Sequence, residues 1–437
     1  MNEIGVRNMI GKHMLTDAIE LVMDLDKSEG CWIVDKRNGD KYLDLYSMYA
    51  SQSIGYNHPD LLEIREKLGK VAVFKPSCSD IYTGEMAEFI STFSQIGIPE
   101  YLPHAFFIEG GALAVENALK TAFDWKVRKN RVKGHKTEIG HKIIHFEQAF
   151  HGRSGYTLSM TNTFSPEKTK YFPKFDWPRI TNPKRIFPTS SENIARVIAA
   201  ENKAITRIKE CISREGADIA GLIIEPVQGE GGDNHFRKEF IQALQQICQE
   251  NEILFIMDEI QTGIGLTGKF WAHEHFDVKP DIISFGKKTQ VCGILAGKRI
   301  DEIEDNVFQE SSRIASTWGG NLIDMVRFTQ ILKTIKKDNL VENARNQGML
   351  LQSELIKLTQ EYPKVLSNAR GIGLMCAVDF NTQEKRDAFI KKIFAEKIIV
   401  IGCGEKTLRF RPHLIVSENE IKYAFERFRS VLKKTDF

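Results

Sequence analysis

The chain has 437 residues, of which 42% are hydrophobic and 27% charged, and its formal net charge is +2 at pH 7. This length predicts more than one domain, and the nearly balanced charge gives no reason to expect nucleic acid or an anionic membrane as a partner. The seven cysteines show no C-x-x-C spacing, which argues against disulfides or a metal site and favours a reducing cytoplasm. The first residues show no basic-then-apolar signal pattern, and no apolar stretch reaches the roughly 18 residues of a membrane-spanning helix, so neither secretion nor membrane insertion is expected.

The first predicted element is a β-hairpin over residues 31–45. Asn38 and Gly39 stand between two apolar-rich segments there, and this pair is a strong signal for a tight turn between antiparallel strands. From residue 105 onward, short apolar runs alternate with helical periodicity. That alternation predicts βαβ units and a mostly parallel sheet covered on both faces.

The first strand of this sheet is predicted at residues 105–108, and Gly110, Gly111 and Ala112 follow it at the start of a helix. Backbone N–H groups at a helix start attract anions, and the glycines allow an anion to approach closely. A phosphate-binding turn is one interpretation of this pattern. An ordinary glycine turn is the other.

A second strand, at residues 142–146, leads into a loop at the same sheet edge that contains Phe150 and Arg153. Phe150 could stack on a cofactor ring or could simply pack in the core. Arg153 lies among glycines and is suited to binding a carboxylate in a bidentate manner. The proline-rich stretch that follows, residues 166–188, is interpreted as an excursion over the mouth of an active site.

A third strand, at residues 219–224, ends at Glu225 and a glycine-rich loop that carries Glu230. Two carboxylates so close together need cations nearby if they are to be buried. A helix over residues 236–250 is predicted to return the chain to the next strand.

The centre of the predicted site is formed by Asp258 and Lys287. Asp258 ends an apolar run at residues 253–257, and Lys287 follows a second strand at residues 281–286. An acid and a lysine on neighbouring strand ends suit pyridoxal phosphate, because the lysine forms a Schiff base with the aldehyde and the acid keeps the pyridine nitrogen protonated. The alternative is a structural ion pair, and the neighbouring motifs favour the cofactor.

The C-terminal third is predicted to contain helices to about residue 360 and then strands at residues 371–380, 398–401 and 407–412. The last strand carries Arg409 and Arg411 at alternate positions. We expect these strands to join the N-terminal hairpin in a smaller α/β domain formed by residues 1–65 and 326–437. Residues 66–325 would form the large domain.

The motifs together resemble those of the class III, pyridoxal-phosphate-dependent aminotransferases over nearly the whole chain. The resemblance is carried by Glu225–Glu230, Asp258–Gly263, Ser284–Lys287, Gly110–Gly111 and Arg409–Pro412, in the family's order and spacing. Agreement among several independent motifs is more specific than any one of them. The resemblance implies an α/β fold of type I, with a mostly parallel seven-stranded sheet in the large domain, and a homodimer with shared active sites.

The resemblance also implies a role for each site residue. Lys287 would bond to the cofactor, Asp258 would pair with the pyridine nitrogen, and Gln261 would reach the ring hydroxyl. Phe150 would stack on the ring, and Glu225 would lie nearby. Gly111 and Ala112 would hold the phosphate beside Gly110, and Thr317 would reach the phosphate in the partner subunit.

Within the family, the motifs are similar to those of enzymes that transfer the ε-amino group of L-lysine to 2-oxoglutarate in two half-reactions. Arg153 would bind the distant carboxylate of either substrate, and Arg409 the carboxylate next to the reacting carbon of the keto acid. Glu230 would neutralise Arg409 when lysine is bound. Ala315 departs from the pattern, in which asparagine is expected, and affects the expected substrate contacts.

Three alternatives remain open at this point. The first is a transaminase for 4-aminobutyrate or another ω-amino acid. The second is another pyridoxal phosphate reaction, such as racemisation or intramolecular amine transfer. The third is an inactive binding protein.

Overall fold

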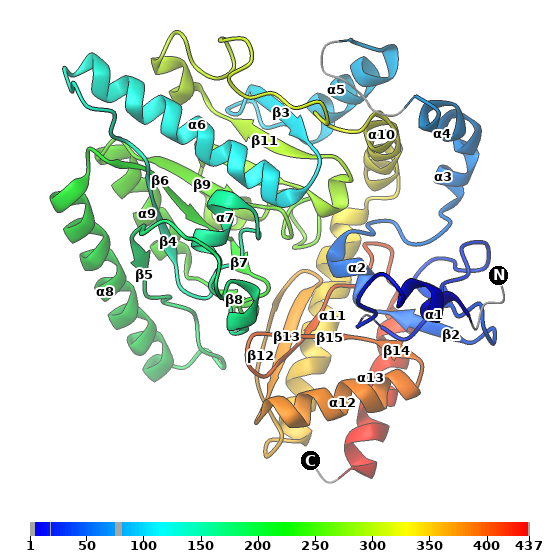
Figure 1. Cartoon of the computed structure of the whole chain (residues 1–437). Coiled ribbons are helices and arrows are strands. Elements are labelled where there is room, and N and C mark those ends of the chain that lie inside the picture. The colour runs from blue at the N-terminus through cyan, green and yellow to red at the C-terminus, as the bar shows by residue number, and fades with distance from the viewer. Residues whose placement is uncertain (1–4, 18, 75–80, 436–437) are drawn as a thin grey trace.

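The structure is a computed structural model that describes residues 5–17, 19–74 and 81–435. Its centre is a seven-stranded sheet, drawn from cyan to yellow-green in Figure 1. The strand order is β3 (His104–Ile108), β11 (Cys292–Ala296), β10 (Ile282–Phe285), β9 (Leu254–Asp258), β6 (Ile219–Ile224), β4 (Lys142–Phe146) and β5 (Arg179–Ile180). β11 pairs antiparallel with both β3 and β10, and the other neighbouring strands pair parallel, so the predicted mostly parallel sheet is confirmed.

Alternate residues of β9 point to opposite faces of this sheet, as the pleat requires. Leu254 and Ile256 belong to the apolar cluster under α6 (Gly111–Val132). Phe255 and Met257 belong to the core on the other side, where α8 (Ser191–Glu215) and α9 (Lys238–Glu250) pack. Both faces are therefore covered, as Figure 1 also shows.

The N-terminal hairpin is confirmed and forms part of a smaller sheet. Strands β1 (Trp32–Val34) and β2 (Lys41–Asp44) pair antiparallel, and β14 (Ile398–Ile399) adds to β2 in parallel. A four-stranded sheet lies beside it, in the order β12 (Leu366–Ile372), β13 (Met375–Phe380), β16 (Thr407–Phe410) and β15 (Ile401–Cys403). The two chain ends thus meet in one group of elements (Figure 1).

Two of the predicted C-terminal strands are each divided into two strands in the structure. The expected single strand over residues 371–380 is a hairpin of β12 and β13, because Gly373 takes a left-handed conformation, with φ of 54°, and turns the chain. The expected strand over residues 398–401 is divided between β14 and β15, which belong to different sheets. Apolar residues continue through both breaks, so hydrophobicity alone did not reveal them.

The remaining elements connect and cover these sheets. They are α1 (Val6–Ile10), α2 (Ser47–Ala50), α3 (Pro59–Glu63), α4 (Arg65–Ala72), α5 (Gly84–Ile96), α7 (Gly155–Met160), α10 (Leu322–Lys337), α11 (Leu340–Glu361), α12 (Gln383–Ala395), α13 (Glu418–Lys434), the strands β7 (Val227–Gln228) and β8 (Asn234–His235), and the 3-10 helices η2 (Pro166–Lys168), η3 (Ala272–Phe276), η4 (Lys287–Thr289) and η5 (Lys298–Glu302). The division of the chain at residues 65 and 325 stays a prediction, and α10 crosses the second boundary as one helix.

Neither a membrane span nor a metal cluster is found in the described part of the chain. No described helix is both long and apolar enough to cross a bilayer. No group of three or more His, Cys, Asp or Glu side chains among the described residues is arranged to hold a metal ion.

Candidate active site

The carboxyl ends of β6, β9 and β10 meet at one edge of the large sheet. A cavity of about 330 Å³ lies at this edge. It is lined by Gly111, Ala112, Phe150, His151, Gly152, Arg153, Glu225, Val227, Glu230, Asp258, Ile260, Gln261, Thr262 and Lys287. Most of the site residues predicted from the sequence are in this set, so the structure brings them together.

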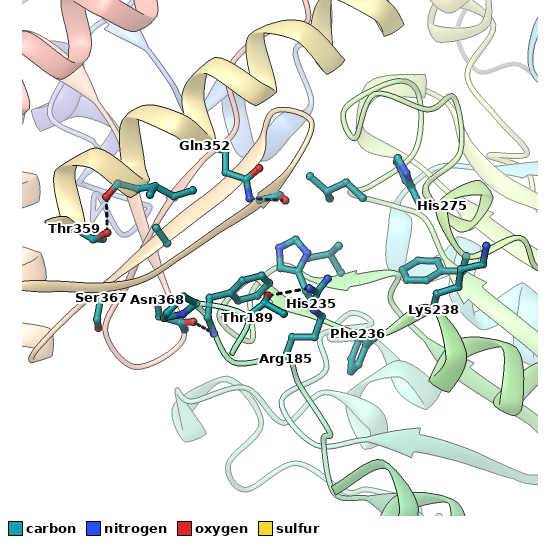
Figure 2. A pocket seen from close by; sticks show the side chains of 18 of the residues that line it. Arg185, Thr189, His235, Phe236, Lys238, His275, Gln352, Thr359, Ser367 and Asn368 are labelled. Atoms are coloured by element: carbon teal, nitrogen blue, oxygen red, sulfur yellow. Dashed lines mark hydrogen bonds between the residues drawn. The ribbon is translucent and has the colours of Figure 1, made fainter. Parts of the chain in front are cut away.

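A larger cavity, of about 790 Å³, lies elsewhere in the molecule. Figure 2 shows Arg185, His235 and Lys238 on one side of it and Gln352 and Thr359 on the other. Of the described residues that line it, none is a predicted site residue. Val227 is the lining residue that the two cavities share. The chemistry suggested by the strand ends therefore belongs to the smaller cavity.

Asp258 ends β9 and is almost completely buried, with 4% of its surface exposed. Its Oδ1 accepts hydrogen bonds from the backbone N of Ile260 at 3.1 Å and from Ser284 Oγ at 3.2 Å. Its Oδ2 accepts a hydrogen bond from His151 Nδ1 at 2.7 Å. The cationic or hydrogen-bonding partner that a buried carboxylate requires is therefore present.

His151 is a site residue to which the sequence interpretation gave no role. Burial lowers the pKa of His151, but the hydrogen bond to Asp258 and the charges of Asp258 and Glu225 outweigh burial and raise its pKa above the usual value. The imidazole thus holds its proton against the carboxylate. The sequence does place His151 near the site, because it directly follows Phe150 in the loop beyond a strand of the same sheet.

Lys287 begins η4 immediately after β10 and lines the cavity. Its φ of 52° lies in the left-handed region, which non-glycine residues adopt at some energetic cost. Burial lowers the pKa of Lys287, although the charge of Asp258 opposes the shift. A larger fraction of its amine is therefore neutral, as a nucleophile or base requires.

The adjacent Lys288 points elsewhere. Its Nζ is buried and donates hydrogen bonds to the backbone oxygens of Gln261, at 2.7 Å, and Ala50, at 3.3 Å. Lys288 is absent from the residues that line the cavity. The geometry thus distinguishes the two neighbouring lysines and leaves Lys287 to face the cavity.

The helix α6 starts at the cavity with Gly111, after Gly110 as its N-cap. Gly110 has φ of 96°, no side chain of the N-cap closes the helix end, and a Cβ at Gly110 would have no described heavy atom within 4 Å. The first amides of a helix have no intrahelical partner. This helix end is therefore suited to a phosphate.

Glu225 lines the cavity and holds two backbone segments of its wall by hydrogen bonds. Its Oε1 accepts a hydrogen bond from the backbone N of Phe150 at 2.9 Å, and its Oε2 accepts one from Gly229 N at 3.1 Å. Burial, with the neighbouring charge of Asp258, raises the pKa of Glu225 to about 7. Glu225 thus fixes the backbone on both sides of the cavity and positions the Phe150 ring.

Arg411, which directly follows β16 of the four-stranded sheet, holds the side chain of Gln261. Its Oε1 accepts hydrogen bonds from Arg411 Nε at 3.1 Å and Nη2 at 3.0 Å, and Arg411 also forms a buried ion pair with Asp233. The Gln261 amide is therefore oriented before any ligand binds.

Glu230 and Arg409 form an ion pair at the wall of the cavity. Arg409 Nη2 donates to Glu230 Oε2 at 2.7 Å, and only 2% of the Arg409 side chain is exposed. The Nε and Nη1 of Arg409 are buried and find no hydrogen-bond partner among the described residues. Arg409 itself is absent from the residues that line the cavity, so it lies behind Glu230, with two guanidinium nitrogens that could bind a carboxylate if Glu230 moved.

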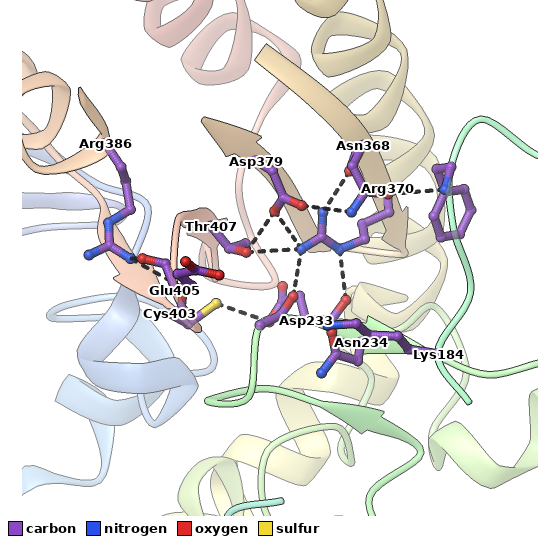
Figure 3. Close-up of polar contacts among 12 residues, drawn as sticks. Lys184, Asp233, Asn234, Asn368, Arg370, Asp379, Arg386, Cys403, Glu405 and Thr407 are labelled. Atoms are coloured by element: carbon purple, nitrogen blue, oxygen red, sulfur yellow. Dashed lines mark hydrogen bonds and ion pairs between the residues drawn. The ribbon is translucent and has the colours of Figure 1, made fainter. Parts of the chain in front are cut away.

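The glycine-rich loop that carries Glu230 is anchored to the four-stranded sheet. Figure 3 shows Arg370 between this loop and Asp379 of β13. Arg370 Nε donates to Asp233 O at 2.9 Å, its Nη2 donates to Gly232 O at 2.5 Å, and the same Nη2 lies 2.9 Å from Asp379 Oδ1. The loop backbone is therefore held by hydrogen bonds from the four-stranded sheet.

Arg153, Thr317 and Ala315 lie at the surface of the single chain. The Arg153 guanidinium lies 5.7 Å from the Phe150 ring centre, and no carboxylate of the described residues pairs with it. Thr317 and Ala315 are exposed and do not line the cavity. The single chain thus brings Arg153 to the site but leaves the expected contact of Thr317 untested.

The cavity has a matching group for each part of pyridoxal phosphate. The N-terminus of α6 suits the phosphate, Asp258 suits a protonated pyridine nitrogen, the Phe150 ring offers an aromatic face, and Lys287 offers an amine for the aldehyde. The residues present therefore fit this cofactor.

Comparison with known proteins agrees with this geometry. A family model described as aminotransferase class-III matches residues 15–432. The L-lysine-epsilon aminotransferase of Mycobacterium tuberculosis is 47% identical over 430 residues, covering 98% of this chain and 95% of that protein. A probable mitochondrial 4-aminobutyrate aminotransferase of Caenorhabditis elegans is 32% identical over 440 residues, covering 96% of this chain and 89% of that protein.

A solved structure of the lysine aminotransferase of M. tuberculosis has a TM-score of 0.97 to this chain at 46% identity and covers 99% of this chain and 100% of that one. The likeness thus extends over the large sheet with its cavity and over the smaller sheets. On the family model, the identity and the fold together, this chain belongs to the class III aminotransferases, whose cofactor is pyridoxal phosphate.

Proposed function

We propose that this chain transfers the ε-amino group of L-lysine to 2-oxoglutarate and releases 2-aminoadipate 6-semialdehyde and L-glutamate. The observation that carries the proposal is the Glu230–Arg409 ion pair beside the cavity, in which two further nitrogens of Arg409 are buried and have no partner among the residues that the structure describes. The identity to lysine aminotransferases, compared with 32% to the 4-aminobutyrate enzyme, supports the same choice of donor.

The Glu230–Arg409 pair suits two substrates that differ next to the reacting carbon. Lysine has an apolar stem there, and an unpaired arginine beside it would be a buried charge without compensation. Glu230 supplies that compensation in the first half-reaction. 2-Oxoglutarate has a carboxylate at the same place, so Arg409 can bind it once Glu230 has moved away. Arg153 would bind the far carboxylate of either substrate.

The bound cofactor, pyridoxal phosphate, would supply an aldehyde that can carry the amino group and a ring that can draw electrons from the reacting carbon. Lys287 Nζ would act as the base that takes the proton from the ε-carbon of lysine, since its pKa is lowered. Asp258, with its charge supported by His151, would hold a proton on the ring nitrogen. Phe150, Gln261, Gly110, Gly111 and Ala112 would hold the ring and the phosphate.

We also propose a cytoplasmic homodimer in which Thr317 completes the phosphate site of the partner subunit. The exposure of Thr317, and of the large apolar side chains of Trp318, Tyr49 and Leu113, supports a covered surface beside the site. Size-exclusion chromatography with light scattering tests the dimer. A monomer with full activity would contradict it.

The donor is tested by a panel of amines at equal concentration, with 2-oxoglutarate as acceptor and glutamate formation as readout. Lysine, ornithine and 4-aminobutyrate are compared by kcat/KM. We expect lysine to be the best donor. A higher value for 4-aminobutyrate would replace the proposal by the ω-amino acid alternative. Conversion of the amine without any 2-oxoglutarate, followed by chromatography of the amine itself, would favour racemisation or intramolecular transfer.

A further inference from the structure

The Glu230 side chain lies between two cavities. On one side is the active-site cavity, and on the other is a cavity of about 420 Å³, here called the rear cavity. The rear cavity is lined in part by Lys168, Arg386 and Gly404. Glu230 is the lining residue that the two cavities share. The side of Glu230 that faces away from Arg409 thus borders a cavity.

Each carboxylate oxygen of Glu230 contacts a different cation. Oε2 accepts a hydrogen bond from Arg409 Nη2 at 2.7 Å, and Oε1 accepts one from Lys168 Nζ. Burial raises the pKa of Glu230, but the charge of Arg409 and the contact with Lys168 outweigh burial and lower its pKa. Glu230 is therefore ionised and held between the two cations.

Arg386, the other cation of the rear cavity, is already engaged. Its Nε donates to Asp387 Oδ1 at 2.8 Å, and its Nη1 donates to the backbone oxygens of Glu405 and Cys403 at 3.0 and 3.3 Å. Figure 3 shows Arg386 beside Cys403 and Glu405. Of the two cations that line the rear cavity, Lys168 is thus the one that contacts Glu230.

We propose that Lys168 and the rear cavity receive the Glu230 carboxylate when the keto acid takes its place on Arg409, which makes Lys168 a positioning residue for the second half-reaction. This inference rests on the proposed function and deepens it. Lys168 lies in η2, within the proline-rich excursion over the site, and its Nζ is 5.9 Å from the Phe150 ring centre.

The movement requires only the side chain of Glu230. The backbone oxygen of Glu230 accepts a hydrogen bond from Gly404 N at 3.0 Å, and Arg370 holds the next turn of the loop through Gly232 O. The backbone therefore stays fixed while the carboxylate turns from Arg409 toward Lys168. A side-chain rotation of this kind is fast compared with typical turnover.

The charges around Glu230 determine how loss of Lys168 changes the binding of a dicarboxylate to Arg409. When Glu230 lies on Arg409, it has two cations, and loss of Lys168 leaves one. When Glu230 has turned away, Lys168 is its remaining cation, and loss of Lys168 leaves a largely buried carboxylate unpaired. Removing Lys168 therefore disfavours the turned-away state more strongly, and binding of a dicarboxylate to Arg409 becomes weaker.

The test measures binding of glutarate, which has the two carboxylates of 2-oxoglutarate but no carbonyl. Glutarate is titrated calorimetrically into the holoenzyme in its aminated form. We expect Lys168→Met to raise the Kd of glutarate about tenfold, equivalent to about 1.4 kcal/mol, while Lys168→Arg stays within about twofold of wild type. The half-saturating concentration of lysine in the first half-reaction should change by less than about twofold.

Lys170→Met is the matched control. Lys170 lies in the same segment but pairs with Glu167 and the ring of Tyr171, so we expect unchanged glutarate binding. A double-mutant cycle separates the turning of Glu230 from simple attraction of the anion by Lys168. In a Glu230→Gln background, Lys168→Met should have no further effect. A tenfold loss that persists there, or no loss in Lys168→Met alone, overturns the inference.

Failure of the proposed function would look different. It would show in the wild-type enzyme as a poor reaction with lysine in the donor panel. Failure of the Lys168 inference would show only in the variants, either as unchanged glutarate binding in Lys168→Met or as a loss that persists in the Glu230→Gln background.

Discussion

Replacing Glu230 by glutamine removes one negative charge and keeps nearly the same shape. In the wild-type structure the Glu230 carboxylate lies 2.7 Å from Arg409 Nη2, and the guanidinium is 2% exposed. Glutamine can still accept a hydrogen bond from Arg409, but it cannot neutralise the charge. The apolar stem of lysine would then lie beside a buried cation without its counter-ion.

The magnitude follows from the type of contact that is lost. A hydrogen bond between charged groups contributes about 1.5–3 kcal/mol, and each 1.4 kcal/mol corresponds to about a factor of ten in affinity. Glu230→Gln should therefore raise the half-saturating concentration of lysine by roughly 10- to 100-fold. The keto acid should bind at least as tightly as in the wild type, because no carboxylate competes with it for Arg409.

The assay is single-turnover stopped-flow, which follows the cofactor's absorbance in each half-reaction separately. Lysine is mixed with the enzyme as purified, and 2-oxoglutarate with the aminated enzyme. Equal losses in both half-reactions would indicate a general structural role for Glu230 and would refute the reasoning. Unchanged lysine dependence would refute it as well.

Three further variants test the cofactor and substrate contacts. Lys287→Ala should abolish turnover, and borohydride reduction with peptide mapping should find the cofactor attached to Lys287 in wild type and to no residue in the variant; attachment to Lys288 would reverse the assignment. Asp258→Asn should keep cofactor content by absorbance but lower kcat by about 10²-fold or more, and a loss within threefold would remove Asp258 from its role. Arg153→Ala should raise the half-saturating lysine concentration about tenfold without slowing the step at saturation, a moderate effect because Arg153 is exposed; unchanged lysine dependence would make it a structural loop residue.

The sequence predicted the large sheet and its active edge well. Strands β4 and β6 have the expected bounds, and the others at this edge differ by a residue or so. Buried parallel strands are continuous apolar runs, and the residue after each run lies at the same edge. The positions of Glu225, Asp258 and Lys287 along one cavity follow from that geometry.

Other parts of the site depend on contacts between distant segments, which periodicity does not encode. Lys168 reaches Glu230 across 62 residues of sequence, and His151 reaches Asp258 across 107. Neither residue has a local pattern that names its partner. The contact between Lys168 and Glu230 follows only from the three-dimensional path of the proline-rich segment.

The segment Ser47–Ala50 is a second case that sequence could not predict. All four residues have φ between 44° and 67°, and none is glycine. Such a left-handed turn costs roughly 1–2 kcal/mol per residue and must be held by its surroundings. Asp44 Oδ1 accepts hydrogen bonds from the N–H groups of Tyr46 and Ser47, and Ser47 Oγ donates to Arg411 O. The turn places the Tyr49 ring 5.6 Å from the Arg409 guanidinium.

In the proposed reaction, nitrogen moves from the ε-position of lysine to 2-oxoglutarate. Two samples of L-lysine can establish this transfer, one carrying ¹⁵N on the ε-amine and the other on the α-amine. Each sample is incubated with the holoenzyme and 2-oxoglutarate, and the glutamate formed is analysed by mass spectrometry. We expect ¹⁵N-glutamate from ε-labelled lysine and unlabelled glutamate from α-labelled lysine. Label arriving in glutamate from the α-amine, or no glutamate from either sample, would contradict the proposed reaction.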